Sequence, residues 1–324
     1  MLRPLFAVAV TAASLAAQQF EPQPPAFAFL QQPPRGLPPM PAPVGYTPTA
    51  AMCELGKDLF HDGVLSKDRS VSCASCHPAT TGFAHPDPKP PGIGGQKAAR
   101  HAPALWNRGY GQLQRWDGST PTLEQFVLEP IGDPKEMGHD VDGAVARLNA
   151  EEPWRAKFTA AFGGPASPKA LQQALATFVR GIVAGDAPYD RFLAGDPSVM
   201  TPQQRHGQWI FESKGGCWKC HTPPLFTDEE FHATGVGAVD GEPEAGHAAV
   251  TADEADRGKW KTPTLRAVRL SAPYMHDGSQ RSLDEVVEFY ARGGNKSRNL
   301  DSRLKPLDLS AEDKAALVAF LKSL

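Results

Sequence analysis

Two copies of one five-residue motif, Cys-x-x-Cys-His, limit what this chain of 324 residues can fold into. The first copy runs from Cys73 to His77 and the second from Cys217 to His221. Cysteines at i and i+3 with a histidine at i+4 lie on one face of a helical turn, so two thiols and an imidazole can address one planar ligand. This pattern is typical of haem c attachment, in which both thiols form thioethers and the imidazole binds the iron. We therefore expect two haem c groups, one on Cys73, Cys76 and His77 and one on Cys217, Cys220 and His221.

The residue content around these motifs excludes other classes of protein. Lys and Arg number 33 against 36 Asp and Glu, a formal net charge of -3, so no bulk positive charge is available to hold nucleic acid. A zinc site would need further Cys or His at ligand spacing, and a redox dithiol would not need a histidine in both copies. Haem c therefore stays the interpretation of both motifs, and no nucleic-acid partner is expected.

The N-terminus has the pattern of an export signal. Arg3 precedes an uncharged apolar run that ends in small residues near Ala17. The run is shorter than the roughly 20 residues of a membrane span. We predict a signal peptide over residues 1–17, cleaved near Ala16 or Ala17, and a periplasmic location, with an uncleaved membrane anchor as the alternative. Residues 18–48 are rich in proline and are expected to form an extended, poorly packed lead-in.

Beyond the lead-in the chain contains a faint duplication. Gly56 opens the segment GKDLF before the first motif, and Gly207 opens GQWIF before the second. Each half ends in an apolar segment of helical period, Ala174–Ile182 in the first and Ala316–Leu324 in the second. No segment alternates polar and apolar residues for long, so strands should be few and short. We predict a mainly α fold of two helical domains, at residues 49–190 and 191–324.

Several longer blocks of the chain carry a resemblance to a known family. They are LGKDLFHDGVLSKDRSVSCASCH from Leu55, Trp-Asp-Gly at Trp116, EMG at Glu136, DRFLAGD at Asp190 and KTPTLRAVRLSAPYMHDGS from Lys261. These blocks resemble the bacterial dihaem cytochrome c peroxidases and their MauG-type relatives. That family has two cytochrome c-like helical domains, whose haems face each other across a tryptophan and a bound calcium ion. The resemblance implies the same fold here, with one covalently attached haem c in each domain.

The resemblance also implies roles for residues outside the two motifs. The haem on the first motif would be the peroxidatic one, which reacts with H2O2. Glu136 would be the distal acid that moves a proton while the O–O bond is cleaved, a role that suits a carboxyl group in a partly apolar pocket. Trp116 would relay electrons between the haems. Without the resemblance, Glu136 is a surface residue at a helix end and Trp116 an ordinary core residue.

Two positions depart from the family pattern near the expected haems. Phe126 stands where a distal Gln is usual, with Gln125 beside it, so the distal pocket is less polar or Gln125 is re-aimed. His101 stands where relatives have an Asn that binds calcium, and imidazole is a poor ligand for a hard cation. The backbone carbonyls of Ser271 and Pro273 are the remaining candidate calcium ligands.

The candidate functions of the chain differ in the sixth ligand that each of the two haem irons would have. Ile93–Gly95 lacks the His that blocks the first haem in many oxidised peroxidases, so this haem is expected to be five-coordinate without prior reduction. The peroxidases place a Met on the second iron, which raises its reduction potential, and here that position is Tyr290. A phenolate stabilises oxidised iron, so Tyr290 resembles the MauG arrangement. Met275, within PYMHDG, is the alternative ligand.

Three functions follow from these expectations. The first is a periplasmic peroxidase that reduces hydrogen peroxide to water at the first haem, with electrons that pass through the second haem from a small exported cytochrome c or cupredoxin. The second is MauG-like, H2O2-dependent oxidation of a protein side chain, a Trp, through a Tyr-ligated second haem. The third is a non-catalytic electron carrier in which both irons are closed. Relatives commonly form dimers, which makes a homodimer a further expectation.

Overall fold

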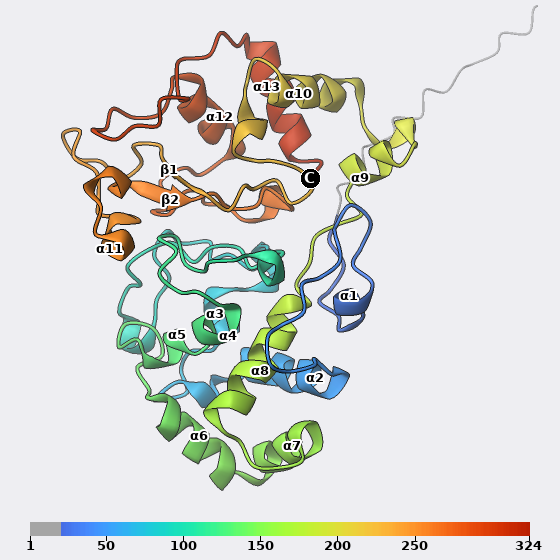
Figure 1. Cartoon of the computed structure of the whole chain (residues 1–324), viewed down its shortest axis with the longest axis vertical. Coiled ribbons are helices and arrows are strands. Elements are labelled where there is room, and N and C mark those ends of the chain that lie inside the picture. Colours follow the sequence, from blue (N-terminus) through green and yellow to red (C-terminus); the bar gives the residue numbers. More distant parts are fainter. Residues whose placement is uncertain (1–20) are drawn as a thin grey trace, which may run out of the picture.

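The computed structural model describes residues 21–324, which form two helix-rich halves stacked one on the other (Figure 1). The predicted signal peptide, residues 1–17, lies outside the described residues. Within them, no helix is both long and apolar enough to cross a membrane. The prediction of a mainly α fold is confirmed by the order of elements along the chain.

The lead-in holds one short helix, α1 (Ala28–Gln31). The first half then contains α2 (Ala50–His61), α3 (Cys73–Cys76), α4 (Leu123–Phe126), α5 (Glu129–Gly132), α6 (Val141–Ala150), α7 (Glu152–Phe162) and α8 (Pro168–Arg180). The second half contains α9 (Pro188–Leu193), α10 (Pro202–Glu212), β1 (Phe231–Ala233), α11 (Ala248–Thr251), β2 (Lys259–Lys261), α12 (Leu283–Ala291) and α13 (Ala311–Leu321). Short 3-10 helices cover Gly63–Leu65, Ala79–Thr81, Ile93–Gly95, Arg108–Tyr110, Pro197–Val199, Cys217–Lys219, Glu254–Asp256 and Val268–Leu270. In the part of the chain described, the one sheet is the antiparallel pair β1–β2, so strands are few and short as predicted.

Each half has its own hydrophobic core. The first core is built from residues 53–184 together with Ala267, and the second from residues 189–324. The predicted division at residue 190 lies close to the place where one core ends and the other begins, and as a domain boundary it stays a prediction.

The duplication seen in the sequence corresponds to one helix crossing that occurs twice. A Cβ added to Gly56 of α2 would lie 2.0 Å from the carbonyl oxygen of Ala174 in α8, and one added to Gly207 of α10 would lie 1.9 Å from that of Ala316 in α13. Glycine is required at both crossings because any larger residue would push the helices apart. The same backbone contact thus closes both halves.

A second repeat links the two halves to each other. Residues 101–120 and 261–280 align without a gap, with Pro, Leu and Asp-Gly-Ser at matching places. In this alignment His101 matches Lys261, and Trp116 matches His276. The backbone N–H of His101 donates to the carbonyl of His276 at 3.0 Å, and that of Lys261 donates to the carbonyl of Trp116 at 2.8 Å. The two segments therefore meet as reciprocal partners, and their contact has an approximate two-fold symmetry.

The lead-in is better packed than we predicted. The carbonyl of Pro38 accepts a hydrogen bond from the Tyr110 hydroxyl of the first half at 2.9 Å. The carbonyl of Gly36 accepts one from the buried Arg266 guanidinium of the second half at 3.1 Å. A proline-rich segment forms few backbone bonds of its own, so its carbonyls are free to accept side-chain donors. Residues 21–48 consequently fasten both halves along the side where they are joined (Figure 1).

Candidate haem sites

The two Cys-x-x-Cys-His motifs hold their histidines in the same way. The Nδ1 atom of His77 donates to the carbonyl of Phe83 at 2.8 Å, and that of His221 donates to the carbonyl of Phe226 at 2.9 Å. Both phenylalanines have a positive φ, 57° and 55°, which turns their carbonyls toward the imidazoles. A bond at Nδ1 fixes the ring and directs Nε2 away from the backbone, as an iron ligand requires.

The chemical state of these residues fits haem attachment. None of the four motif cysteines takes part in a disulfide. Burial raises the pKa of Cys73 and of Cys217 to about 12, the opposite of the lowered pKa that a reactive dithiol needs. Burial lowers the pKa of His77 to about 4, so its imidazole is neutral and able to bind a metal. Thiols paired with a neutral, oriented imidazole are the donor set of haem c.

Glu136 lies on the first site. Burial and, after it, the charge of Glu136 raise the pKa of the Cys76 thiol to about 11. Burial and the neighbouring Asp133 in turn raise the pKa of Glu136 itself. The loop that includes Ile93–Gly95 supports this position, because the Ile93 N–H donates to the Glu136 carbonyl at 2.8 Å. A partly buried carboxyl group with a raised pKa therefore lies near the first pair of cysteines.

The residue at the usual distal Gln position is apolar in the structure as well. Phe126 packs against the first core, whereas Gln125 is exposed and makes no side-chain hydrogen bond within residues 21–324. The guanidinium carbon of Arg115 lies 5.8 Å from the centre of the Phe126 ring, and Arg115 lowers the pKa of Glu136. Sequence reasoning missed Arg115, because no motif marks it and its place beside Phe126 arises from a turn with a φ of 66°.

Tyr290 lies on the second site. Burial and, after it, the charges of Cys220 and Cys217 raise the pKa of the Tyr290 phenol, so its hydroxyl is close to both cysteines. Within residues 21–324 no hydrogen bond is made by that hydroxyl, which leaves its oxygen free for a ligand. Met275, the alternative, occupies a turn with a φ of 73° between Tyr274 and Gln280.

The repeated segments also indicate which site is open. Thr122 and Ser282 cap α4 and α12 at matching places, and the next residue in each, Leu123 and Leu283, is buried. Carried on without a gap, the alignment pairs Tyr290 with Pro130 in α5. Proline has no side-chain ligand atom, so the first half has no phenol at the position that the alignment pairs with Tyr290. The helices also differ there, because α12 is continuous whereas the first half has the separate helices α4 and α5.

Trp116 lies where the two halves meet. Its indole N–H donates to the carbonyl of His101 at 2.8 Å, and its own carbonyl accepts from the Lys261 N–H. Its ring lies edge-on to the imidazole of His276, with 6.5 Å between ring centres. Trp116 belongs to the first half and is held in part by the second, which is the placement expected of a residue between two haems.

A buried charge cluster crosses the same contact and was not found from sequence. Glu229 of the second half pairs with Arg108 of the first half at 3.0 Å and with Lys261 at 3.4 Å. Burial lowers the pKa of Lys261 to about 7. One carboxylate thus bonds to a guanidinium and to an amine that burial makes easier to deprotonate, and the cluster ties the two halves together beside Trp116.

Calcium at the backbone carbonyls of Ser271 and Pro273 stays a prediction, whereas the His101 side chain can be judged from its hydrogen bond. The Nε2 atom of His101 donates to the His85 carbonyl at 2.8 Å. His101 thus presents a hydrogen-bond donor where a cation would need oxygen, so its side chain does not fit calcium.

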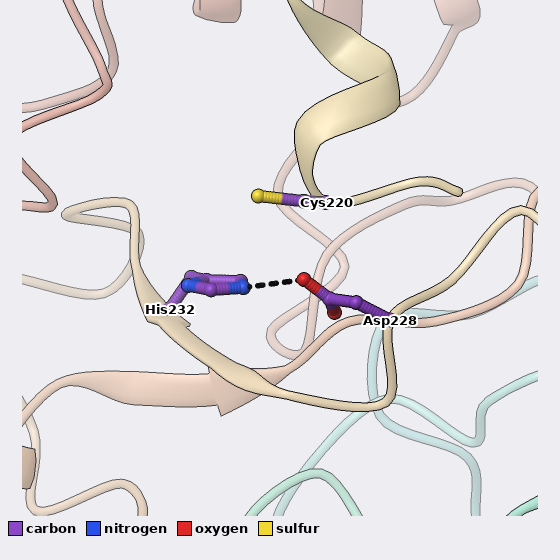
Figure 2. A group of neighbouring side chains, drawn as sticks. All are labelled: Cys220, Asp228 and His232. Atoms are coloured by element: carbon purple, nitrogen blue, oxygen red, sulfur yellow. Dashed lines mark hydrogen bonds and ion pairs between the residues drawn. The ribbon is translucent and has the colours of Figure 1, made fainter.

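One group of potential metal ligands occurs in the described residues, and it belongs to the second haem site. Cys220, Asp228 and His232 lie together, with His232 Nε2 bonded to Asp228 at 2.9 Å (Figure 2). The other nitrogen of His232 lies 3.1 Å from Asp301. Cys220 is one of the two expected thioether positions and both nitrogens of His232 have protein partners, so this group is a polar wall of the haem site. Sequence reasoning assigned His232 no role.

Comparison with known proteins gives consistent results. The family model for di-haem cytochrome c peroxidase matches residues 50–198. Over 287 residues the chain is 37% identical to the methylamine utilization protein MauG of Methylorubrum extorquens, which covers 88% of this chain and 81% of that protein. It is 36% identical to the cytochrome-c peroxidase IdrP2 of Denitromonas iodatirespirans, with 85% of this chain and 82% of that protein covered.

Solved structures give the same result for the fold. A MauG-like protein associated with microbial copper homeostasis superposes with a TM-score of 0.84 at 32% identity, over 90% of this chain and 94% of that one. The diheme peroxidase BthA of Burkholderia thailandensis superposes with a TM-score of 0.73 at 23% identity, over 86% of this chain and 87% of that one, and supports the fold alone.

Proposed function

Because the chain belongs to the dihaem cytochrome c peroxidase and MauG family, we propose that this haem oxidoreductase uses H2O2 to oxidise a protein side chain through a second haem ligated by Tyr290. The observation that carries the proposal is the unpartnered Tyr290 hydroxyl beside Cys217 and Cys220. The family implies two c-type haems, on the two motifs. Export to the periplasm, two cytochrome c-like domains and a homodimer belong to the same proposal.

The residues of the first site would handle the protons of the peroxide reaction. Haem bound there supplies the reduction of H2O2 to two water molecules, which consumes two electrons and two protons. The Glu136 carboxylate takes a proton from the oxygen of H2O2 that binds and returns it to the oxygen that leaves. Its raised pKa suits a group that must both accept and release a proton. Phe126, at the usual distal Gln position, offers no ligand atom to that haem.

The second site would hold the oxidising equivalent. A phenolate is an anionic oxygen ligand, so it stabilises oxidised iron and lowers the reduction potential relative to a Met ligand. A donor cytochrome would then reduce the site poorly, whereas a side chain on a docked protein could be oxidised. Trp116, between the two halves, would carry electrons from the second site to the first.

A second candidate function is cytochrome c peroxidase activity with a small cytochrome or cupredoxin as donor. It is favoured by relatives such as IdrP2, whose name states that activity. It requires a second site that a donor can reduce, for which Met275 would have to replace Tyr290 as ligand. The electron-carrier alternative is disfavoured, since the named relatives are peroxidases and MauG proteins.

The deciding experiment adds one equivalent of H2O2 to the fully oxidised holoprotein and records absorption from the Soret band into the near infrared. We expect a rapid change without prior reduction, with a long-wavelength band that reports charge shared between the haems. The Tyr290→Phe variant should lose that band and shift the low-spin spectrum, while a Tyr46→Phe variant serves as a matched control. A reaction that begins only after one haem is reduced would contradict the proposal and favour the donor-dependent peroxidase.

A further inference from the structure

His101 makes three hydrogen bonds to three different segments. Its backbone N–H donates to the carbonyl of His276 at 3.0 Å, and its imidazole Nε2 donates to the carbonyl of His85 at 2.8 Å. Its carbonyl accepts the indole N–H of Trp116 at 2.8 Å. The residue is 3% exposed. One buried residue therefore joins the loop after the first motif, the inter-half tryptophan and a turn of the second half.

The turn that follows His276 is packed closely against the segment that follows His85. A Cβ added to Gly278, in the turn that follows His276, would lie 2.7 Å from the Cα atom of Pro88. Burial lowers the pKa of His101, so its ring is neutral and carries a single N–H. The His85 carbonyl accepts that proton, which makes the imidazole a donor at this point. The bond would be lost if any non-donor side chain stood at position 101.

A divalent cation does not fit this arrangement. Calcium needs six to eight oxygen ligands at about 2.3–2.6 Å, and these usually include carboxylates. In residues 21–324, the one group of three His, Cys, Asp or Glu side chains able to hold a metal is Cys220, Asp228 and His232 at the second haem site. The His85 carbonyl already bonds to an N–H. The neutral N–H of the His101 ring thus contacts the His85 carbonyl oxygen, the kind of atom that a cation would otherwise bind.

We propose that His101 is a positioning residue that holds Trp116 across the contact between the halves and takes the place of a calcium ion there. The symmetry of the contact supports this role, since the matching residue, Lys261, bonds to Trp116 from the other side. Lys261 holds the Trp116 backbone, whereas His101 holds its side chain.

The first test is calcium removal from the holoprotein, and it does not use peroxide. We expect the purified, desalted protein to contain no calcium, and its absorption spectrum and melting temperature to be equal in EGTA and in CaCl2. A stoichiometric calcium ion whose removal changes the spectrum or the melting temperature would overturn the proposal. Because neither the absorption spectrum nor the melting temperature is measured with H2O2, this result is independent of the proposed function.

The second test measures electron exchange between the two haems after flash reduction of one of them. We expect His101→Ala to slow the exchange about tenfold, because without the bond from its imidazole to the His85 carbonyl the backbone carbonyl that accepts the Trp116 indole N–H is no longer fixed. Trp116→Phe should slow the exchange similarly, and the double variant should show no further loss, because both changes act on the position of the same indole. Added calcium should not restore the rate. His85→Ala is the matched control, since it deletes a buried histidine but keeps the carbonyl that His101 uses. Wild-type exchange in His101→Ala, or rescue by calcium, would overturn the proposal.

The third test asks whether the histidine is what excludes the ion. His101→Asn replaces the N–H donor with an amide that also offers an oxygen. We expect CaCl2 to raise the melting temperature of this variant by roughly 2–4 °C while leaving the wild type unchanged. If neither protein responds to calcium, His101 does not occupy a cation position and that part of the proposal fails.

Discussion

The two candidate haem sites are alike on the histidine side and different on the opposite side. In both, a positive-φ phenylalanine carbonyl orients the histidine, and in both a helix pair crosses at a glycine. Near the cysteines the first site has the Glu136 carboxyl group, and the second has the Tyr290 phenol. The duplicated scaffold binds the two groups, and a few unmatched side chains then decide what each group does.

The difference can be traced to two aligned positions. Pro130 and Tyr290 match in the repeat, as do Trp116 and His276. A proline at position 130 has no side-chain ligand atom, whereas a tyrosine at position 290 has a phenol, the ligand proposed for the second site. The backbone contacts are the same in both copies of the repeat, because they depend on residue spacing. The side chains differ between the copies, and the side chains decide the chemistry of each site. Variants that change one site, or one half of the molecule, at a time therefore test this comparison directly.

The largest effect is expected from removing one pair of cysteines at a time. Cys73→Ala with Cys76→Ala should abolish the reaction with H2O2, because the open site loses its covalent haem. Cys217→Ala with Cys220→Ala should leave peroxide binding at the first site and abolish the near-infrared band. Haem content by the pyridine haemochrome assay should fall by half in both. Equal loss of peroxide reactivity in the two variants would show that the sites do not differ as described.

The next effect concerns proton transfer at the first site. Glu136→Gln should slow the reaction with H2O2 by about 10²–10⁴-fold without changing haem content. The pKa of Glu136 is raised, so the base form is lost as the pH falls through a value above the ordinary 4.3 or so of a Glu. The wild-type rate should decrease over that range, and the variant should lack this limb in stopped-flow rates across pH. An identical pH profile in the two proteins would exclude Glu136 as the proton carrier.

A smaller effect should be the same in both halves. Gly56→Ala and Gly207→Ala each place a methyl group against a helix carbonyl, at 2.0 Å and 1.9 Å. We expect each to lower the free energy of unfolding by about 2–4 kcal/mol, measured by denaturant titration of the holoprotein. Serine at a helix cap, such as Ser167→Ala, is a control for helix stability alone, with an expected loss of about 1 kcal/mol. Strongly unequal losses at the two glycines would break the match between the halves.

The smallest effect is expected in the lead-in. Tyr46→Phe removes the hydrogen bond from the Tyr46 hydroxyl to Glu124, which measures 3.0 Å. The free energy of unfolding should fall by about 1 kcal/mol, with no change in haem spectra. A change in the spectrum of either haem would mean that the lead-in acts on the sites and not only on the packing of the first half.

The parts of the fold predicted from sequence are those with a local signal. The helical period of Ala174–Ile182 and Ala316–Leu324 predicted α8 and α13, and Ser310 with Asp313 forms the cap of α13. The prolines of the lead-in predicted an extended backbone. They did not predict that its carbonyls accept hydrogen bonds from the side chains of Tyr110 and Arg266. Arg115 and Glu229 lie in no motif, and Lys261 opens a family block that gave it no role, so their parts in the structure are known only from their neighbours in space.

The sequence by itself determined that two thiols and one imidazole come together twice. Those residues are at most four positions apart, so one turn of backbone brings them to one face. Only the tertiary structure decided that Tyr290 faces Cys217 and Cys220, and that His101 and Lys261 hold Trp116. These partners are up to 145 residues apart, as the numbers 116 and 261 show. Their meeting depends on how two cores pack together, which no local pattern encodes.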